Sequence, residues 1–358
     1  MKKPRFWIGV AISLIALFFA FRQVNFAKVW AALAGVNYWL LLASLLPLLL
    51  FLVLRAFRWR LLFYPQRGLR IRNLFAVINI GYLISNIFPA RLGDVARAYL
   101  IGDTEEVSRA AAFSTIVAER VLDALCAVGG LLLVLPFAPL PDWMVRSGLM
   151  VGAVALVAVA LFVVLVRRRA WTLRLLDRIL NAVHWPDDET MARFWRRLAA
   201  RTRLRFLAGL PWADRSDVAG MAASLIDGFG GITTLRLGPR LVLWSIAIWT
   251  AITTYYWVVL RAFAPGQPFV AGLAMCSVTA LGMTIPASPG YIGVFEFLGR
   301  ETMVLFGMEP EAALGYALVA HAIVYVVYTL LGLGSMVQQN LTYTEIQKRI
   351  SVEAQPSS

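Results

Sequence analysis

ISNIFPARLGDVAR at residues 84–97 and TIPASPGYIGVFE at residues 284–296 are the two stretches that decide the fold of this chain. Each contains Pro-Ala-x-x-Gly inside an otherwise apolar segment, and each continues to a carboxylate, Asp94 in the first and Glu296 in the second. Helix breakers at corresponding places in two halves of a membrane protein are typical of discontinuous helices that line a substrate path near the bilayer midplane. The two stretches therefore predict a transporter.

The composition is that of a membrane protein. Of 358 residues, 60% are hydrophobic and only 15% are charged, which is too apolar for a soluble domain of this size. A first apolar segment at 6–21 is interpreted as an uncleaved helix, with a cleaved signal peptide ending near Ala34 as the alternative. Runs long enough to span a bilayer follow at 38–54, 147–166, 241–260 and 312–336, with a more polar one at 111–137.

The net charge of +14 is distributed unevenly. Basic residues crowd one loop from Arg55 to Arg72 and another from Arg167 to Arg205, whereas the connections at 138–146 and 262–268 carry at most one each. By the positive-inside rule, the two basic loops and the N-terminus are expected in the cytoplasm, with the chain in the plasma membrane. No nucleic-acid partner is expected, because the distribution of the charge is explained by membrane topology.

This topology places the two quoted stretches at the tips of hairpins that enter the membrane from opposite sides. Segment 73–110 is expected to enter from the cytoplasm and return there, and segment 268–308 to enter and return on the outer side. The predicted fold is therefore an all-α polytopic membrane protein of about six full transmembrane helices plus two opposed re-entrant helical hairpins, arranged like an inverted repeat. Two full crossings in each region, giving eight or more spans, satisfy the same topology.

The domain prediction is one transmembrane domain at 1–341 and a polar, disordered cytoplasmic tail at 342–358. Within the domain, 167–240 is expected to be a cytoplasmic or interfacial connector. Apolar residues from Trp171 to Leu180 recur at helical spacing among charged ones, and a second basic helix is expected at 191–204.

Helix starts are expected at both interruptions. Ser288 suits an N-cap, Pro289 suits the first helical position, and Gly290 with Gly293 permits close backbone approach. In the first stretch Gly93 and Asp94 open a helix. Helix N-termini at the midplane attract an anionic headgroup, and two nearby arginines would add hydrogen bonds to a phosphate, Arg91 and Arg97. The alternative is that the prolines only kink helices and the arginines reach toward lipid headgroups.

A second group of charges interrupts the apolar helix at 111–137. Glu119 and Asp123 lie one turn apart on one face, with Arg120 three residues from Asp123. Charges inside a membrane segment are costly unless paired or hydrated, so they are expected to face the interior, either as a structural ion-pair network or in contact with cargo. Glu296 is a candidate proton carrier because it is a lone carboxylate among apolar residues, and His321 in the last span is either a packing residue or a relay.

Motifs of soluble enzymes are missing from the sequence. It contains no paired-histidine metalloprotease motif, no Gly-x-Ser-x-Gly, no P-loop and no GxGxxG. Cys126 and Cys276 lie in apolar segments and imply neither a disulfide framework nor a zinc site. No catalytic residue, metal or cofactor is therefore expected.

The polar residues of these segments resemble, in order, the signatures of the lysylphosphatidylglycerol synthase transmembrane domain family, also called flippase-like or UPF0104 proteins. The resemblance covers about residues 5–340 and rests on Asn86, Pro89, Arg91, Gly93, Asp94, Arg97, Glu119, Arg120, Asp123, Pro289, Gly290, Gly293 and Glu296. In bifunctional synthases of this family, the domain is associated with moving an aminoacylated lipid, while a separate soluble domain makes it. No synthase domain is expected here, since a short tail follows the last span. Two departures are Asp94, where a glutamate is usual, and Tyr291, which replaces a glycine.

The resemblance implies a lipid translocase in the plasma membrane of a bacterium or archaeon, with a bilayer lipid bearing an anionic or phosphate group as its substrate. The expected substrate-binding and translocation residues are Asn86, Pro89, Arg91, Gly93, Asp94, Arg97, Glu119, Arg120, Asp123, Ser288, Pro289, Gly290, Gly293, Glu296 and His321. One alternative is a non-transporting membrane partner of a glycosyltransferase or lipid-modifying enzyme. Another is a membrane-embedded enzyme that uses Glu119, Asp123 or Glu296 on a lipid phosphate.

Overall fold

The computed structural model describes residues 4–22, 24–64, 68–88, 92–138, 168–182, 237–284 and 288–339, with isolated positions between 142 and 164. Every regular element in these ranges is helical. Within these described ranges, three helices are long and apolar enough to cross a membrane, namely α3 (Tyr38–Leu62), α11 (Gly238–Phe263) and α14 (Pro310–Gln338). The prediction of an all-α polytopic membrane protein is confirmed.

The other helices complete this frame. At the N-terminus, α1 (Pro4–Phe21) and α2 (Phe26–Ala34) form a pair bent by 80°. The helix interrupted by charges is α6 (Arg109–Val134), and the predicted amphipathic helix is α8 (Arg169–Ala182). Side-chain caps fix several starts, since Asn37 accepts from two backbone amides at the start of α3 and Ser108 accepts from Ala111 in α6.

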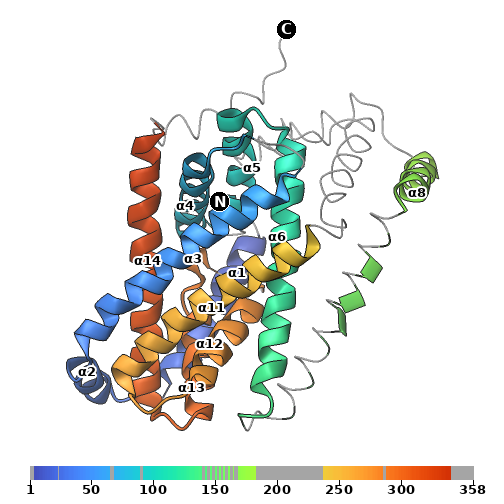
Figure 1. Cartoon of the computed structure of the whole chain (residues 1–358). Coiled ribbons are helices and arrows are strands. Elements are labelled where there is room, and N and C mark those ends of the chain that lie inside the picture. The colour runs from blue at the N-terminus through green and yellow to red at the C-terminus, as the bar shows by residue number, and fades with distance from the viewer. Residues whose placement is uncertain are drawn as a thin grey trace.

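Both predicted interruptions are present, and each separates the arms of a hairpin. The first hairpin is α4 (Ile71–Ile87) and α5 (Leu92–Glu105), and the second is α12 (Phe269–Gly282) and α13 (Val294–Leu305). None of these arms reaches the roughly 20 residues that a full crossing needs. In Figure 1 α4 and α5 lie in the upper part of the molecule, and α12 and α13 lie in the lower part. This arrangement supports opposed re-entrant hairpins over eight full spans.

Helix packing follows a twofold pattern. α3 packs along α11 in the opposite direction, with Asn37 N donating to Ala262 O at 3.2 Å at one end of the pair. α4 of the first hairpin packs on α14, and α12 of the second packs on α6. Exchanging the two halves therefore reproduces the same helix pairs, which is the packing expected of an inverted repeat.

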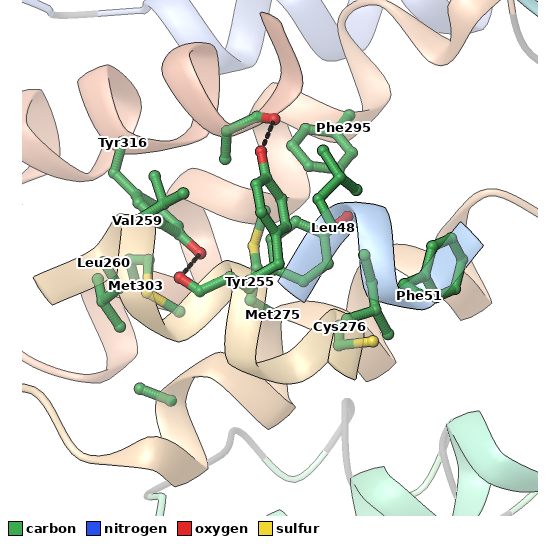
Figure 2. Packing of buried hydrophobic residues seen from close by; sticks show 14 of the residues in the cluster. Leu48, Phe51, Tyr255, Val259, Leu260, Met275, Cys276, Phe295, Met303 and Tyr316 are labelled. Atoms are coloured by element: carbon green, nitrogen blue, oxygen red, sulfur yellow. Dashed lines mark hydrogen bonds between the residues drawn. The ribbon is translucent and has the colours of Figure 1, made fainter. Parts of the chain in front are cut away.

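Two apolar clusters hold the halves together. One surrounds Trp59 on α3, and the other surrounds Tyr255 on α11. Figure 2 shows the second cluster, in which the Tyr255 hydroxyl donates to Ala320 O at 2.6 Å and the Tyr316 hydroxyl donates to Tyr256 O at 3.2 Å. Because the hydroxyls of Tyr255 and Tyr316 both have a backbone acceptor, these two large rings fill the core with their polar groups satisfied.

The structure corrects two sequence predictions. Arg55 and Arg58 are not loop residues, because α3 continues to Leu62 and buries both arginines against other helices. The α-helix expected to start at Pro289 starts at Val294 instead. Only one turn of 3-10 helix, η2 (Pro289–Tyr291), forms at the proline, since left-handed φ angles of 65° at Gly290 and 58° at Tyr291 end it. The 191–204 helix and the 342–358 tail lie outside the described residues.

Candidate functional site

A cluster of arginines and carboxylates from three helices is the main polar feature of the described interior. Glu119 on α6 lies at its centre and is fully buried. One carboxylate oxygen accepts from Arg55 of α3 and lies 3.6 Å from Arg58 Nη2, and the other accepts from Arg97 of α5 at 2.7 Å. One carboxylate therefore joins three helices.

Asp123, one turn further along α6, joins the same two arginines of α3. Its oxygens accept from Arg55 at 3.0 Å and from Arg58 at 2.7 Å. Arg58 also donates to Ser245 Oγ on α11 at 3.0 Å, so the cluster reaches the antiparallel partner of α3. The two arginines are three residues apart and the two carboxylates are four residues apart, and each spacing is about one helical turn. The arginines therefore lie on one face of α3, and the carboxylates lie on the face of α6 opposite them.

Asp94 and Arg120 form the outer part of the cluster. The Arg120 guanidinium donates to both carboxylate oxygens of Asp94, at 3.0 and 2.6 Å, in a bidentate pair. Asp94 lies in the first turn of α5, as predicted, and its Oδ1 is also 3.7 Å from Arg97 Nη1. The Arg120 side chain is 34% exposed, whereas that of Arg97 is 3% exposed.

The cluster carries an excess of positive charge. Four arginines face three carboxylates, so one positive charge remains among Arg55, Arg58, Arg97, Arg120, Asp94, Glu119 and Asp123. Nε of Arg55, Arg58 and Arg97 and Nη1 of Arg97 have no hydrogen-bond acceptor within the described part of the chain. A buried guanidinium is costly unless it is neutralised and hydrogen-bonded, so the cluster is suited to receive an anion.

Aromatic rings line the arginines. The Arg97 guanidinium lies 4.3 Å from the centre of the Trp59 ring, and Arg55 lies 5.9 Å from that of Tyr82. Tyr82 in turn stacks on Tyr328 of α14 at 4.3 Å. Rings in these positions supply cation–π attraction and keep the guanidinium groups in fixed orientations.

A second polar group lies at the start of α13. Glu296 Oε2 accepts from the Gly293 amide at 2.6 Å and so caps its own helix, and Oε1 lies 2.6 Å from Nδ1 of His321 on α14. Glu296 is 4% exposed. The expectation of a lone carboxylate is wrong, because a histidine and a backbone donor both face it. The histidine ring also stacks on Phe295 at 4.4 Å.

The tips of the two hairpins meet on α14. Asn86 at the end of α4 donates to Tyr325 O and to Thr329 Oγ1, both at 3.2 Å. Gly290 of the second tip packs on the same Tyr325 ring, because a Cβ atom placed there would lie 2.8 Å from Tyr325 Cε2. Ser288 N donates to Ser13 Oγ of α1 at 2.9 Å. The two hairpin tips, whose prolines Pro89 and Pro286 stand 197 residues apart in the sequence, are thus neighbours.

Most predicted site residues therefore fall into two groups. Asp94, Arg97, Glu119, Arg120 and Asp123 belong to the ion-pair cluster, in which Gly93 allows α5 to approach α4 closely. The remaining described residues gather at the tips and on α13 and α14, namely Asn86, Ser288, Pro289, Gly290, Gly293, Glu296 and His321. Pro89 and Arg91 lie outside the described residues.

Sequence reasoning missed Arg55, Arg58, Trp59 and Tyr82. A signal was present for the two arginines, because they lie three residues apart immediately after an apolar run and match the spacing of the carboxylates on α6. Arg60 and further arginines follow them closely in the sequence, and a run of basic residues after an apolar segment is typical of a cytoplasmic loop.

Comparison with known proteins agrees with these signatures. The family model described as the lysylphosphatidylglycerol synthase TM region matches residues 6–332. The glycosyltransferase AglD of Haloferax volcanii is 29% identical over 279 residues, which cover 72% of this chain and 42% of that protein. The UPF0104 membrane protein MJ1595 of Methanocaldococcus jannaschii is 43% identical over 54 residues, 14% of this chain and 16% of that protein. The match covers less than half the length of either relative. Because the family model covers most of the sequence, this chain belongs to the family of lysylphosphatidylglycerol synthase transmembrane regions.

Proposed function

We propose that this protein moves a lipid with a phosphate-bearing, anionic headgroup across the plasma membrane. The observation that carries the proposal is the buried excess of positive charge beside an interrupted membrane helix. A phosphodiester carries one negative charge and oxygen acceptors, which match the single uncompensated positive charge and the unsatisfied guanidinium nitrogens of Arg55, Arg58 and Arg97.

The second support is the arrangement of the hairpins. Two half-length hairpins that meet between the halves of an inverted repeat allow one binding position to be exposed alternately to the two sides. The energetic problem of lipid translocation is the headgroup, because the acyl chains remain in hydrocarbon throughout. A buried arginine cluster lowers that cost by replacing water around the phosphate.

Reconstitution tests the proposal. Purified protein in liposomes containing headgroup-labelled phosphatidylglycerol should increase the fraction of label accessible to an impermeant quencher over time. Arg97→Lys keeps the charge but loses the planar fork, so translocation should fall at least about tenfold. Arg109→Lys is the matched control, since the Arg109 side chain is 39% exposed in a surface pair with Asp103. Equal rates for the two variants, or wild-type liposomes no faster than empty ones, would contradict the proposal.

A second candidate function follows from the similarity to a protein named as a glycosyltransferase. In that case the chain would be the membrane partner of a lipid-modifying enzyme and would present a lipid without moving it. Pull-down of a glycosyltransferase activity that survives Arg97→Lys, together with no translocation by wild-type protein, would favour this function. Chemical change of the lipid by the purified protein alone would favour a membrane-embedded enzyme.

A further inference from the structure

The position of Asp94 indicates a site in which the protein's own carboxylate occupies the place of a ligand. Asp94 Oδ1 lies 2.6 Å from Arg120 Nη2 and 3.7 Å from Arg97 Nη1, so one oxygen stands between two guanidinium groups. The other oxygen accepts from Arg120 Nε at 3.0 Å. Oxygens held between two planar guanidinium forks are also the arrangement by which arginines bind phosphate.

Arg97 is not fully satisfied by this carboxylate. Its Nη2 donates to Glu119 at 2.7 Å, but within the described ranges Nε and Nη1 have no acceptor, and the residue is only 2% exposed. The 3.7 Å separation from Asp94 is too long for a hydrogen bond. Buried donors without acceptors are costly, so a group with more oxygens than a carboxylate would be favoured between Arg97 and Arg120.

Exposure gives the order in which a ligand meets these groups. The side chains of Arg120 and Asp94 are 34% and 16% exposed, while those of Arg97 and Glu119 are 3% and 0% exposed. A ligand therefore reaches Arg120 first and meets Arg97 only when Asp94 moves away. Asp94 lies in the first turn of α5, where the helix dipole also favours an anion.

We infer that the space between Arg97 and Arg120 is the phosphate-binding position and that Asp94 is an internal counter-ion, displaced when phosphate binds. Return of the carboxylate to Arg120 competes with the bound phosphate and promotes its release. The identity of the ligand as a lipid headgroup rests on the proposed function, but the anion site can be tested without transport. Asp94 acts through the two arginines and is a positioning residue in this scheme.

The test is anion binding by purified variants. Asp94→Asn removes the competing charge at nearly constant size, so the concentration of inorganic phosphate that half-saturates thermal stabilisation should fall about tenfold relative to wild type. Sodium chloride at matched ionic strength corrects for screening. Asp103→Asn is the matched control, because Asp103 lies on the same helix and pairs with Arg109 at 2.9 Å on the surface. No fall for Asp94→Asn, or an equal fall for Asp103→Asn, overturns the inference.

Two further variants distinguish a change in anion binding from a folding defect. Adding Arg97→Gln to Asp94→Asn should abolish the gain, and persistence of the gain would place the anion elsewhere. Asp94→Glu keeps the charge and extends the carboxylate toward Arg97, so it should fold and should raise the half-saturating concentration above that of wild type. Binding by Asp94→Glu as tight as that of wild type, or tighter, would contradict competition by the carboxylate.

Parallel titration with short-chain phosphatidic acid separates a lipid headgroup from free phosphate. A gain for both probes supports the inference with a lipid headgroup as the ligand. A gain for inorganic phosphate alone supports the anion site and overturns a lipid ligand. Wild-type translocation separates this inference from the proposed function. If Asp94→Asn gains binding but the wild-type protein does not translocate lipid, the anion site stands and the proposed function fails. If the wild-type protein translocates lipid but Asp94→Asn gains no binding, the proposed function stands and this inference fails.

Discussion

Arg97 crosses α4 at Gly81. A Cβ atom built on Gly81 would lie 2.5 Å from Arg97 Cγ, 2.7 Å from Cδ and 3.1 Å from Gly93 O. These distances are well inside van der Waals contact, so the stem of Arg97 reaches Glu119 and Trp59 only because position 81 has no side chain. A glycine on α4 thus sets the position of an arginine on α5.

The first prediction concerns this contact. Gly81→Ala should push the Arg97 stem away from α4, weaken its pair with Glu119, and lower stability by about 1–3 kcal/mol through overpacking. Phosphate binding should weaken as well. Thermal unfolding in detergent and phosphate titration measure both effects. Gly129→Ala on α6 is the control, since the added Cβ meets no atom of the described residues within 4 Å, and the variant should be neutral or stabilised by up to about 1 kcal/mol. Equal behaviour of the two variants would refute the steric argument.

The second prediction concerns Glu119. Glu119→Gln removes a fully buried charge that faces Arg55 and Arg97, so two guanidinium groups lose their shared counter-ion and stability should fall by about 3–5 kcal/mol. Chemical denaturation or thermal unfolding measures the loss. Glu301→Gln is the control, because the Glu301 side chain is 43% exposed and pairs only with its neighbour Arg300 among the described residues. A loss of similar size in both would show that the cluster contributes no special stability.

The interruptions and the charged turn of α6 could be predicted because they depend on local chemistry. Proline, glycine and a carboxylate predict a helix start from only a few neighbouring residues, as at Gly93 and Asp94. The role of Arg55 could not be read in this way. Its partners, Glu119 and Asp123, are 64 and 68 residues away, and only the packing of α3 on α6 brings them together. The pairing of Glu296 with His321 was missed for the same reason.

The third prediction tests the opposed hairpins. In a variant without Cys126 and Cys276, a single cysteine replaces Ser108, between α5 and α6, or Gly266, between α11 and α12. Both positions are exposed. Arg109 follows the first connection, and Arg70 lies at the same end of the first hairpin, where its amide donates to Glu105 at 3.3 Å. By the positive-inside rule, Ser108→Cys should be protected from an impermeant thiol reagent in whole cells, and Gly266→Cys should react. Reaction of both cysteines from outside would rule out hairpins that return on opposite sides.

The last prediction concerns Glu296 and His321. Oε1 of the carboxylate lies 2.6 Å from Nδ1 of the imidazole, while Oε2 caps α13 through the Gly293 amide, so protonation of the pair is linked to the start of this helix. Other polar groups near the pair, among the described residues, include Tyr325 of α14, whose ring lies 6.4 Å from that of His321, and Tyr256 of α11, which packs on Phe295. The backbone of Ser13 on α1 lies beside Gly293. Among the described residues, no arginine or lysine forms an ion pair with Glu296.

Glu296→Gln keeps the size and the helix cap but removes the charge that faces the histidine. If the pair exchanges a proton during translocation, the variant should fold with a loss of about 1 kcal/mol, its turnover should fall, and its rate should depend less on pH than the wild-type rate does. Translocation rates in proteoliposomes at several pH values, together with unfolding temperatures, measure these effects. Glu301→Gln on the same helix should keep the wild-type profile. A Glu296→Gln variant with the wild-type pH profile and rate would leave the pair with a structural role, because removal of the titrating carboxylate would then have changed nothing that transport depends on.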